Sequence, residues 1–125
     1  MQLYLFKAEE IVCLHDAVLN PGELSGFAGN KSLEGALARV EFRINYGMIN
    51  DVFDLAAMYA VAIAQAHVFN DANKRTAHAA LEYVLLKHGQ HIVFETKLVG
   101  NMIVEVAQGK VDETELANWL RRQAS

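Results

Sequence analysis

The sequence contains few of the residues that crosslink, interrupt or anchor a chain. Its one cysteine, Cys13, excludes an internal disulfide and a zinc site built from several cysteines, and its apolar neighbours predict that it is buried. Because there is one proline in 125 residues, long helices are possible almost everywhere. The longest apolar run, Leu55–Ala64, is half alanine and too short to span a bilayer, so it predicts a buried helix.

Positive charge is also scarce. Eleven Lys and Arg residues against fifteen Asp and Glu residues give a formal net charge of −4. Nucleic acids and anionic membranes attract a basic protein face, so this balance argues against direct binding to either. The first residues have no basic start, no long apolar stretch and no cleavage site of a signal peptide. We therefore expect a cytoplasmic protein.

Length and apolar content indicate one domain over residues 1–125. A chain of this length buries about two thirds of the surface that its unfolded form exposes, and 53% of its residues are hydrophobic. Apolar residues recur at helical spacing, which predicts an all-α bundle of about six helices. The expected helices cover residues 8–19 and 98–108 and four segments that begin near Ser32, Asp51, Ala72 and Asp112.

The segments between these helices carry fewer signals. Residues 22–31 contain several glycines and predict a flexible loop, flap or small hairpin between the first two helices. Residues 91–95 predict a brief extended piece. Arg39, Arg43 and Tyr46 share one helix face, which suits salt bridges or contact with a partner.

Polar residues are concentrated in one segment, residues 67–77, between two apolar helices. A helix that begins near Ala72 leaves the N–H groups of its first turn without intrahelical partners, and its dipole is positive at that end. Lys74 and Arg75 add two full charges there. Backbone donors, dipole and cations together predict an anion site, most naturally for phosphate.

The neighbouring side chains suggest what happens at this site. Asp71 either caps the helix or binds a magnesium ion that also contacts the phosphates. His67 ends the preceding helix and can accept a proton from an attacking hydroxyl. Asn73 holds either the loop or a phosphate oxygen with its amide. Phe69 is an apolar residue between polar ones, which predicts an anchor that fixes the turn to the core.

Residues 67–75 resemble the signature of the Fic/Doc family, His-x-Phe-x-Asp/Glu-Gly/Ala-Asn-Gly/Lys-Arg. The lysine at position 74 is similar to the Doc branch, the death-on-curing toxins of Phd-Doc toxin–antitoxin systems. Other Doc-type stretches are His15-Asp16, residues 33–39 and the helix start at Asp51, so the resemblance covers most of residues 11–80.

The resemblance implies a role for each residue of the signature. It implies that His67 is the base that deprotonates a target hydroxyl, that Asp71 binds Mg2+, and that Phe69 anchors the motif. The phosphate-binding positions that it implies are Ala72, through its backbone, Asn73, Lys74 and Arg75. ATP is the implied substrate. Residues 22–31 fall where the family carries a flap that pairs with the target peptide.

Two positions favour phosphate transfer over AMP transfer. Relatives that transfer AMP usually carry glycine at the position of Lys74 and a second arginine at the position of His78. The resemblance to the Doc branch therefore implies that the γ-phosphate of ATP moves to a protein hydroxyl, with elongation factor Tu as the target and inhibited translation as the result. It also implies a small Phd-like antitoxin, whose disordered segment folds into a groove on the protein.

Three alternatives remain open. The same site could transfer AMP, or it could bind anions in a non-catalytic interaction module. A metal-dependent hydrolase built on His15 and Asp16 would need further ligands, for which His88 and His91 are the candidates. The simpler interpretation of His15 and Asp16 is hydrogen bonding at the helix surface or between helices.

Overall fold

The computed structural model describes residues 2–29, 31–90 and 95–124. Its six helices are α1 (Ala8–Val18), α2 (Leu33–Asn45), α3 (Val52–Ala66), α4 (Asn73–Lys87), α5 (Thr96–Ala107) and α6 (Glu113–Ala124). Within the described residues the β-type pairing is limited to an isolated bridge between Phe27 and Phe69. The prediction of an all-α bundle is confirmed. The extended piece expected at 91–95 lies almost entirely outside the described residues.

Helices α2, α3 and α6 begin at the capping residues that the sequence predicts. The Ser32 hydroxyl accepts a hydrogen bond from the Gly35 N–H at 3.2 Å, and an Asp51 carboxylate oxygen accepts from the Asp54 N–H at 3.0 Å. Such side-chain acceptors satisfy N–H groups that the first helical turn leaves free. At the start of α6, Asp112 and Glu115 each accept a hydrogen bond from the other's N–H, which forms a capping box.

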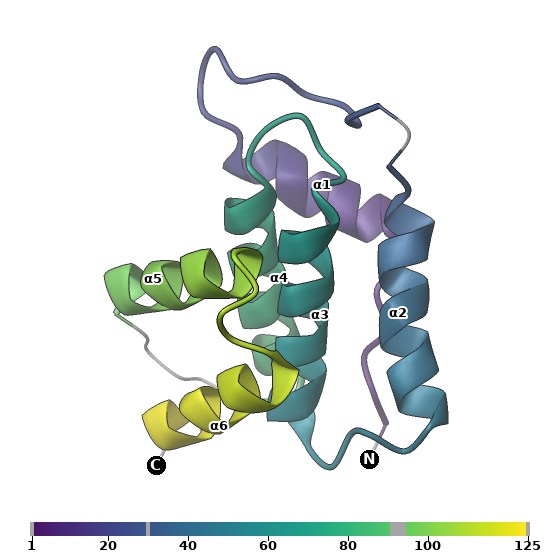
Figure 1. Cartoon of the computed structure of the whole chain (residues 1–125), viewed down its shortest axis with the longest axis vertical. Helices are drawn as coiled ribbons and strands as arrows, with labels where there is room; N and C mark the ends of the chain where they lie inside the picture. The colour runs from purple at the N-terminus through teal and green to yellow at the C-terminus, as the bar shows by residue number, and fades with distance from the viewer. Residues whose placement is uncertain (1, 30, 91–94, 125) are drawn as a thin grey trace.

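Helix α3 lies at the centre of the bundle (Figure 1), where α2, α4, α5 and α6 all pack against it. Every residue from Leu55 to Ala64 is buried. The alanines of this run leave room for neighbouring helices to approach closely, which explains why α3 is apolar on all sides. No helix in the described part of the chain has the length and apolar character to cross a membrane.

Helix α1 crosses one end of the bundle and packs on α4 (Figure 1). Its buried residues are Ile11 and His15, four positions apart on one face. Cys13 lies on another face and is exposed, so the prediction that it is buried is wrong. Apolar neighbours in sequence do not share a helix face, because consecutive residues point about 100° apart.

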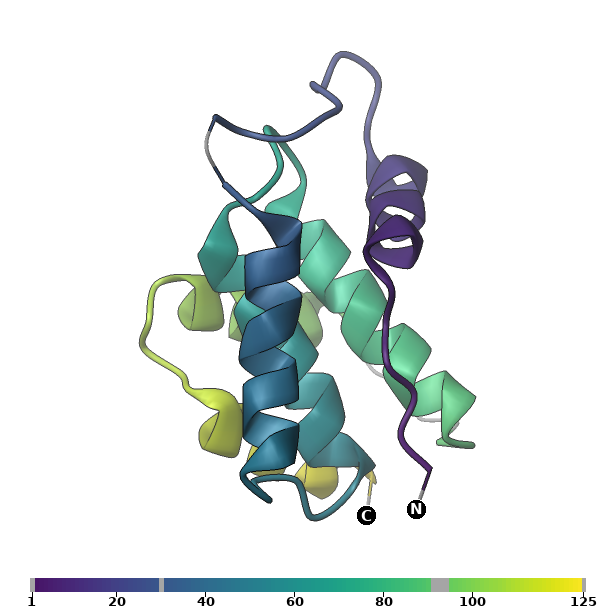
Figure 2. The same cartoon turned by 90° about the vertical axis from the view of Figure 1, so that its right-hand side faces the viewer.

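The chain between α1 and α2 returns to the end of the bundle where α3 and α4 join. Figure 2 shows this connection and the α3–α4 turn side by side. We call residues 19–29 the flap. The Ala28 N–H donates to the Val68 carbonyl at 2.7 Å, and the Asn70 N–H donates to the Gly26 carbonyl at 3.1 Å. The flap therefore pairs with the turn rather than with itself.

Candidate active site

The turn that joins α3 to α4 begins and ends with a residue in the left-handed conformation. His67 follows α3 with a φ of 50°, and Ala72 precedes α4 with a φ of 67°. Residues other than glycine adopt this conformation infrequently, and strain of this kind is common at functional sites. The Fic/Doc signature allows glycine at the position of Ala72, which agrees with the backbone that the position requires.

Hydrogen bonds to the backbone hold this turn in its conformation. The Asn73 amide nitrogen donates to the Phe69 carbonyl at 2.9 Å, and the Asn73 amide oxygen accepts from the Phe69 N–H at 3.0 Å. The buried Thr76 hydroxyl donates to the Ala72 carbonyl at 2.7 Å. The sequence leaves open whether the Asn73 amide holds the loop or a phosphate oxygen. In the structure the amide holds the loop.

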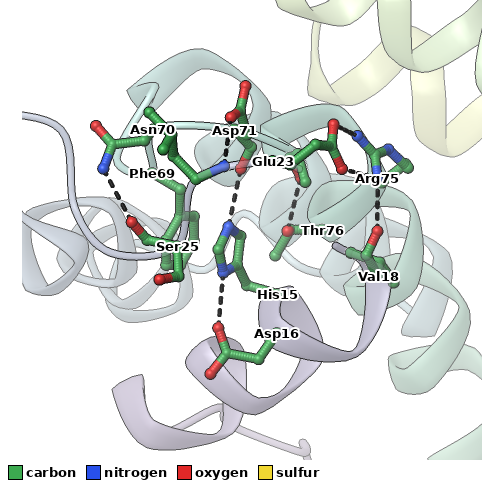
Figure 3. Close-up of polar contacts among 12 residues, drawn as sticks. His15, Asp16, Val18, Glu23, Ser25, Phe69, Asn70, Asp71, Arg75 and Thr76 are labelled. Carbon is green, nitrogen blue, oxygen red and sulfur yellow. Dashed lines mark hydrogen bonds and ion pairs between the residues drawn. The ribbon is translucent and has the colours of Figure 1, made fainter. Parts of the chain in front are cut away.

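His15 supports the turn from below, as Figure 3 shows. Its side chain is fully buried, its Nε2 donates to the Asp71 carbonyl at 2.8 Å, and its Nδ1 lies 3.1 Å from an Asp16 carboxylate oxygen. The imidazole stacks on Phe69, with ring centroids 3.8 Å apart and planes 11° apart. Phe69 itself is 3% exposed. His15 and Phe69 together attach the turn to α1 and the core.

This arrangement gives no support to a metal centre built on His15. Both nitrogens of the His15 ring already have partners, the Asp71 carbonyl and the Asp16 carboxylate. His88, another candidate ligand, accepts a hydrogen bond from the Tyr4 N–H at 3.0 Å. His91 lies outside the described residues. Among the residues that the structure describes, no group of three or more His, Cys, Asp or Glu side chains is arranged to hold a metal ion.

The first turn of α4 has free donors at the place where the sequence predicts an anion site. In the described residues no carbonyl or side chain accepts from the N–H groups of Asn73, Lys74 and Arg75, whereas the Thr76 N–H already bonds to the Ala72 carbonyl at 2.9 Å. The Lys74 side chain is exposed. Three amide donors, the positive end of a helix and an ammonium group therefore meet at one place.

Arg75 lies on the side of this site that faces α1 and the flap (Figure 3). Its guanidinium donates to both carboxylate oxygens of Glu23 and to the Val18 carbonyl at the end of α1. The hydrogen bonds from Arg75 hold the pKa of the Glu23 carboxyl below its ordinary value, so Glu23 is ionised at neutral pH. The sequence contains no signal for this ion pair beyond placing Glu23 in a glycine-rich segment.

The carboxylate of Asp71 also contacts the flap. Its Oδ2 accepts a hydrogen bond from the Leu24 N–H at 2.7 Å. Its Oδ1 has no partner among the described residues. A magnesium ion bound to a nucleotide needs one or two protein carboxylates, with phosphate and water oxygens completing its shell. The single carboxylate of Asp71 beside an anion site fits that requirement.

His67 is exposed, unlike Val68 and Phe69, which follow it in the turn and are buried. No group in residues 2–29, 31–90 and 95–124 hydrogen-bonds to its ring. The residue follows the last turn of α3 and stands six positions before the first residue of α4. It is therefore available to a molecule that approaches from solvent.

A hollow of about 260 Å³ lies beside Arg75, along the side of α4 that faces the end of α1. Its lining includes Val18, Arg75, His78 and Glu82. His78 Nε2 and Glu82 Oε1 are 2.6 Å apart. At the position where AMP-transferring relatives carry a second arginine, this chain thus has a histidine paired with a carboxylate.

These features define a class of protein, an all-helical bundle in which one turn carries an exposed histidine at its start and a helix N-terminus with free N–H groups at its end. Residues 5–85 match the Fic/DOC family, and the protein belongs to this family. The chain is also 37% identical over 115 residues to the protein named Protein kinase doc of Escherichia phage P1. That alignment covers 91% of this chain and 90% of the phage protein.

Proposed function

We propose that this protein is a Doc-like kinase that transfers the γ-phosphate of ATP to a hydroxyl group of a target protein. The observation that carries the proposal is an exposed His67 ring with no hydrogen-bond partner in the described residues, at one end of the turn whose other end carries the free N–H groups of the first turn of α4. The kinase name of the phage P1 relative supports the same assignment.

In this mechanism the start of α4 binds the phosphates of ATP, and His67 acts as the base for the target hydroxyl. The N–H groups of residues 73–75, Lys74 and Arg75 neutralise phosphate charge and orient the γ-phosphate. His67 accepts the proton of the target hydroxyl, whose oxygen then forms a bond to the γ-phosphorus. The bond from this phosphorus to the bridging oxygen breaks, and ADP leaves with that oxygen. Mg2+ held by Asp71 would neutralise charge on the phosphates.

Two residues favour phosphate transfer over AMP transfer. Lys74 adds a full charge and a long side chain at the first turn of α4, where AMP-transferring relatives usually have glycine. His78 is paired with Glu82, whose carboxylate repels a phosphate group. Both features disfavour the phosphate arrangement that brings the α-phosphate to His67.

ATP labelled separately on the γ- and α-phosphates tests the assignment. The protein is incubated with Mg2+, a candidate target and each labelled ATP, and the target is then analysed by mass spectrometry. We expect label from the γ-phosphate alone and a phosphate-sized mass increase. Label from the α-phosphate with a nucleotide-sized increase would identify the protein as an AMP transferase. Tight ATP binding without any transfer would identify a non-catalytic module.

We further propose that the protein acts in the cytoplasm as the toxin of a toxin–antitoxin pair, with elongation factor Tu as target and a Phd-like antitoxin as partner. Membership of the Fic/DOC family and the similarity to the phage P1 relative support this proposal. Expression should arrest growth and leave elongation factor Tu phosphorylated, and co-expression of the antitoxin should restore growth. Growth arrest with unmodified elongation factor Tu would point to a different target.

A further inference from the structure

His15 lies in the core below the candidate site and outside the signature in residues 67–75. Its ring is completely buried, and its Nε2 donates to the Asp71 carbonyl (Figure 3). Burying a polar ring is unfavourable unless its nitrogens find partners, whereas an apolar side chain would pack without that requirement. The hydrogen bond to Asp71 is thus what a histidine provides at this position and an apolar residue does not.

The Asp71 carbonyl belongs to the same planar peptide group as the N–H of Ala72. In a trans peptide these two groups point in opposite directions, and no cis peptide bond occurs in the described residues. Because His15 holds the carbonyl, the Ala72 N–H points away from the buried ring. No group in residues 2–29, 31–90 and 95–124 accepts a hydrogen bond from this N–H. Ala72 thus adds a fourth free donor to those of residues 73–75.

The backbone of Ala72 makes this orientation dependent on an outside contact. Its φ of 67° lies in the left-handed region, which is unfavourable for alanine. Rotation of the peptide group by half a turn would bring this φ to about −110°, a value that alanine adopts readily. The rotated peptide would present the Asp71 carbonyl oxygen where the Ala72 N–H now lies. The orientation of this one peptide therefore decides whether the position attracts or repels a phosphate group.

Two contacts keep the His15 ring in the orientation that its bond to Asp71 requires. Phe69 stacks on the ring, with planes 11° apart, and fixes the plane of the imidazole. An Asp16 carboxylate oxygen lies 3.1 Å from Nδ1. If the ring turned over, a carbon would replace Nδ1 beside Asp16 and another would replace Nε2 beside Asp71. Asp16 therefore favours the orientation in which Nε2 reaches the Asp71 carbonyl.

We propose that His15 is a positioning residue, which holds the Asp71–Ala72 peptide so that the Ala72 N–H is available to a phosphate group, and that Asp16 orients the His15 ring for this role. His15 acts through the backbone and does not contact the ligand. The identity of the ligand as ATP rests on the proposed function. The orientation of the peptide affects any phosphate-bearing ligand at the start of α4.

Two substitutions of His15 test the proposal. His15→Phe removes the donor and keeps a flat ring on Phe69, whereas His15→Gln returns an amide N–H near the place of Nε2. Affinity for inorganic tripolyphosphate is measured by calorimetry for the wild type and both variants. We expect His15→Phe to bind about tenfold more weakly, the loss of one charge-assisted contact, and His15→Gln to bind within about threefold of the wild type.

Ile11→Val is the matched control. It lowers stability from the same buried face of α1 and removes no hydrogen bond to the turn. Its affinity for tripolyphosphate should change by less than about twofold. Asp16→Ala is a milder test of the same proposal at a side chain that is 59% exposed, so the fold is retained. This variant should bind tripolyphosphate about threefold more weakly, because the ring loses the contact that orients it.

Nuclear magnetic resonance of the Ala72 amide provides a readout that a loss of stability alone would not change. Its signal should shift when saturating tripolyphosphate is added to the wild type and to His15→Gln. In His15→Phe it should stay in place, because the N–H no longer faces the ligand. The Lys74 amide should respond in all three proteins, which shows that the ligand is bound.

Each outcome decides the proposal. Unchanged affinity in His15→Phe overturns it, and so does an equal loss in His15→Phe and Ile11→Val. A loss that His15→Gln does not recover also overturns it, because the ring rather than its N–H then matters. If His15→Phe does not fold, Asp16→Ala decides, and unchanged affinity there contradicts the proposal.

The same measurements separate this proposal from the kinase assignment. Weaker binding by His15→Phe, in a protein whose wild type transfers no phosphate, supports the positioning role and removes the kinase assignment. If the wild type does not bind tripolyphosphate, both proposals are wrong.

Discussion

The two ends of α3 use charged and polar residues in opposite ways. At its N-terminal end, the Arg121 guanidinium donates to both carboxylate oxygens of Asp51, at 2.8 and 3.0 Å, and to Asp54 at 2.6 Å. Asp51 also caps the helix. At its C-terminal end, His67 and Lys74 are exposed and have no hydrogen-bond partner in the described residues. One end is closed by its own ion pairs, whereas the other leaves His67 and Lys74 open to solvent beside the Arg75–Glu23 ion pair.

This contrast separates residues that stabilise the fold from residues that are positioned for a ligand. Within the open end the same division recurs on a smaller scale. Some polar side chains form hydrogen bonds to the backbone of the turn, namely those of His15, Asn73 and Thr76. His67 and Lys74 are carried by that turn and keep their polar atoms available. The strain at His67 and Ala72 persists because the surrounding hydrogen bonds fix the turn.

The largest expected effect is on catalysis, from His67→Asn. Asparagine tolerates the left-handed backbone of this position better than alanine does, so the turn is preserved. We expect phosphate transfer to fall by a factor of about 10² to 10⁴, the contribution of a general base. The free energy of unfolding, measured by urea denaturation, should change by less than about 0.5 kcal/mol because the side chain is exposed.

His67→Ala is the comparison variant, since it removes the same ring but places alanine at a φ of 50°. It should be as inactive as His67→Asn and somewhat less stable. Wild-type transfer rates in His67→Asn would show that the proton is taken by another group.

The second prediction separates Asn73 from Lys74, neighbours in the first turn of α4. Asn73→Ala leaves the N–H and carbonyl of the buried Phe69 without their partners, so it should lower the free energy of unfolding by about 1–3 kcal/mol. Lys74→Ala should leave stability unchanged and weaken ATP binding by about tenfold, the loss of one charge-assisted contact. Denaturation and calorimetry on both variants measure the difference.

Equal losses of stability in these two variants would contradict the division between residues that hold the turn and residues that it presents. Unchanged ATP affinity in Lys74→Ala would remove that lysine from the phosphate site.

Much of the fold could be predicted because its signals are local. Caps at Ser32, Asp51 and Asp112, the apolar run of α3 and helical spacing each depend on a few neighbouring residues. The prediction for Cys13 failed because burial depends on which helix face meets a neighbour, and only the packed α1 reveals that the face contains Ile11 and His15. Salt bridges predicted for Arg39 and Arg43 are confirmed, and both arginines bond to Glu113.

The candidate site was predictable as a set of residues but not as a set of contacts. The signature in residues 67–75 locates the turn, because its residues are consecutive. Glu23 and Arg75 are far apart in sequence, and their pairing depends on where the flap returns to the bundle. The role of His15 under Asp71 likewise requires the angle at which α1 crosses α4, which no short pattern in the sequence specifies.

The third prediction concerns a polar group that serves the fold alone. Glu113 is 7% exposed, and its Oε2 accepts a hydrogen bond from Arg39 and forms an ion pair with Arg43, both with N···O distances of 2.9 Å. Glu113→Gln should lower the free energy of unfolding by about 2 kcal/mol, less than for a fully buried pair because both arginines are partly exposed. Glu41→Gln, at an exposed position that lies between the two arginines in sequence but on another face of α2, should change it by less than about 0.5 kcal/mol. Phosphate transfer should be unaffected in both variants. Loss of transfer in Glu113→Gln would show that the cluster of Arg39, Arg43 and Glu113 also supports the active site.

The smallest expected effect tests the closed end of α3 through pH. Hydrogen bonds from Arg121 hold the pKa of the Asp51 carboxyl below its ordinary value. A lowered folded-state pKa stabilises the protein above the unfolded-state pKa of about 3.9, and the stabilisation is lost as the pH falls through the folded-state value.

The free energy of unfolding of Arg121→Gln should therefore lie about 1 kcal/mol below the wild type at pH 7, a small amount because both partners are partly exposed to water. Chemical denaturation of the two proteins from neutral pH down to about pH 3 should show this difference shrinking only below about pH 4. A difference that shrinks between about pH 6 and 5 would assign the stabilisation to a group other than Asp51, and the closed end of α3 would then depend on different charges from those that the geometry indicates.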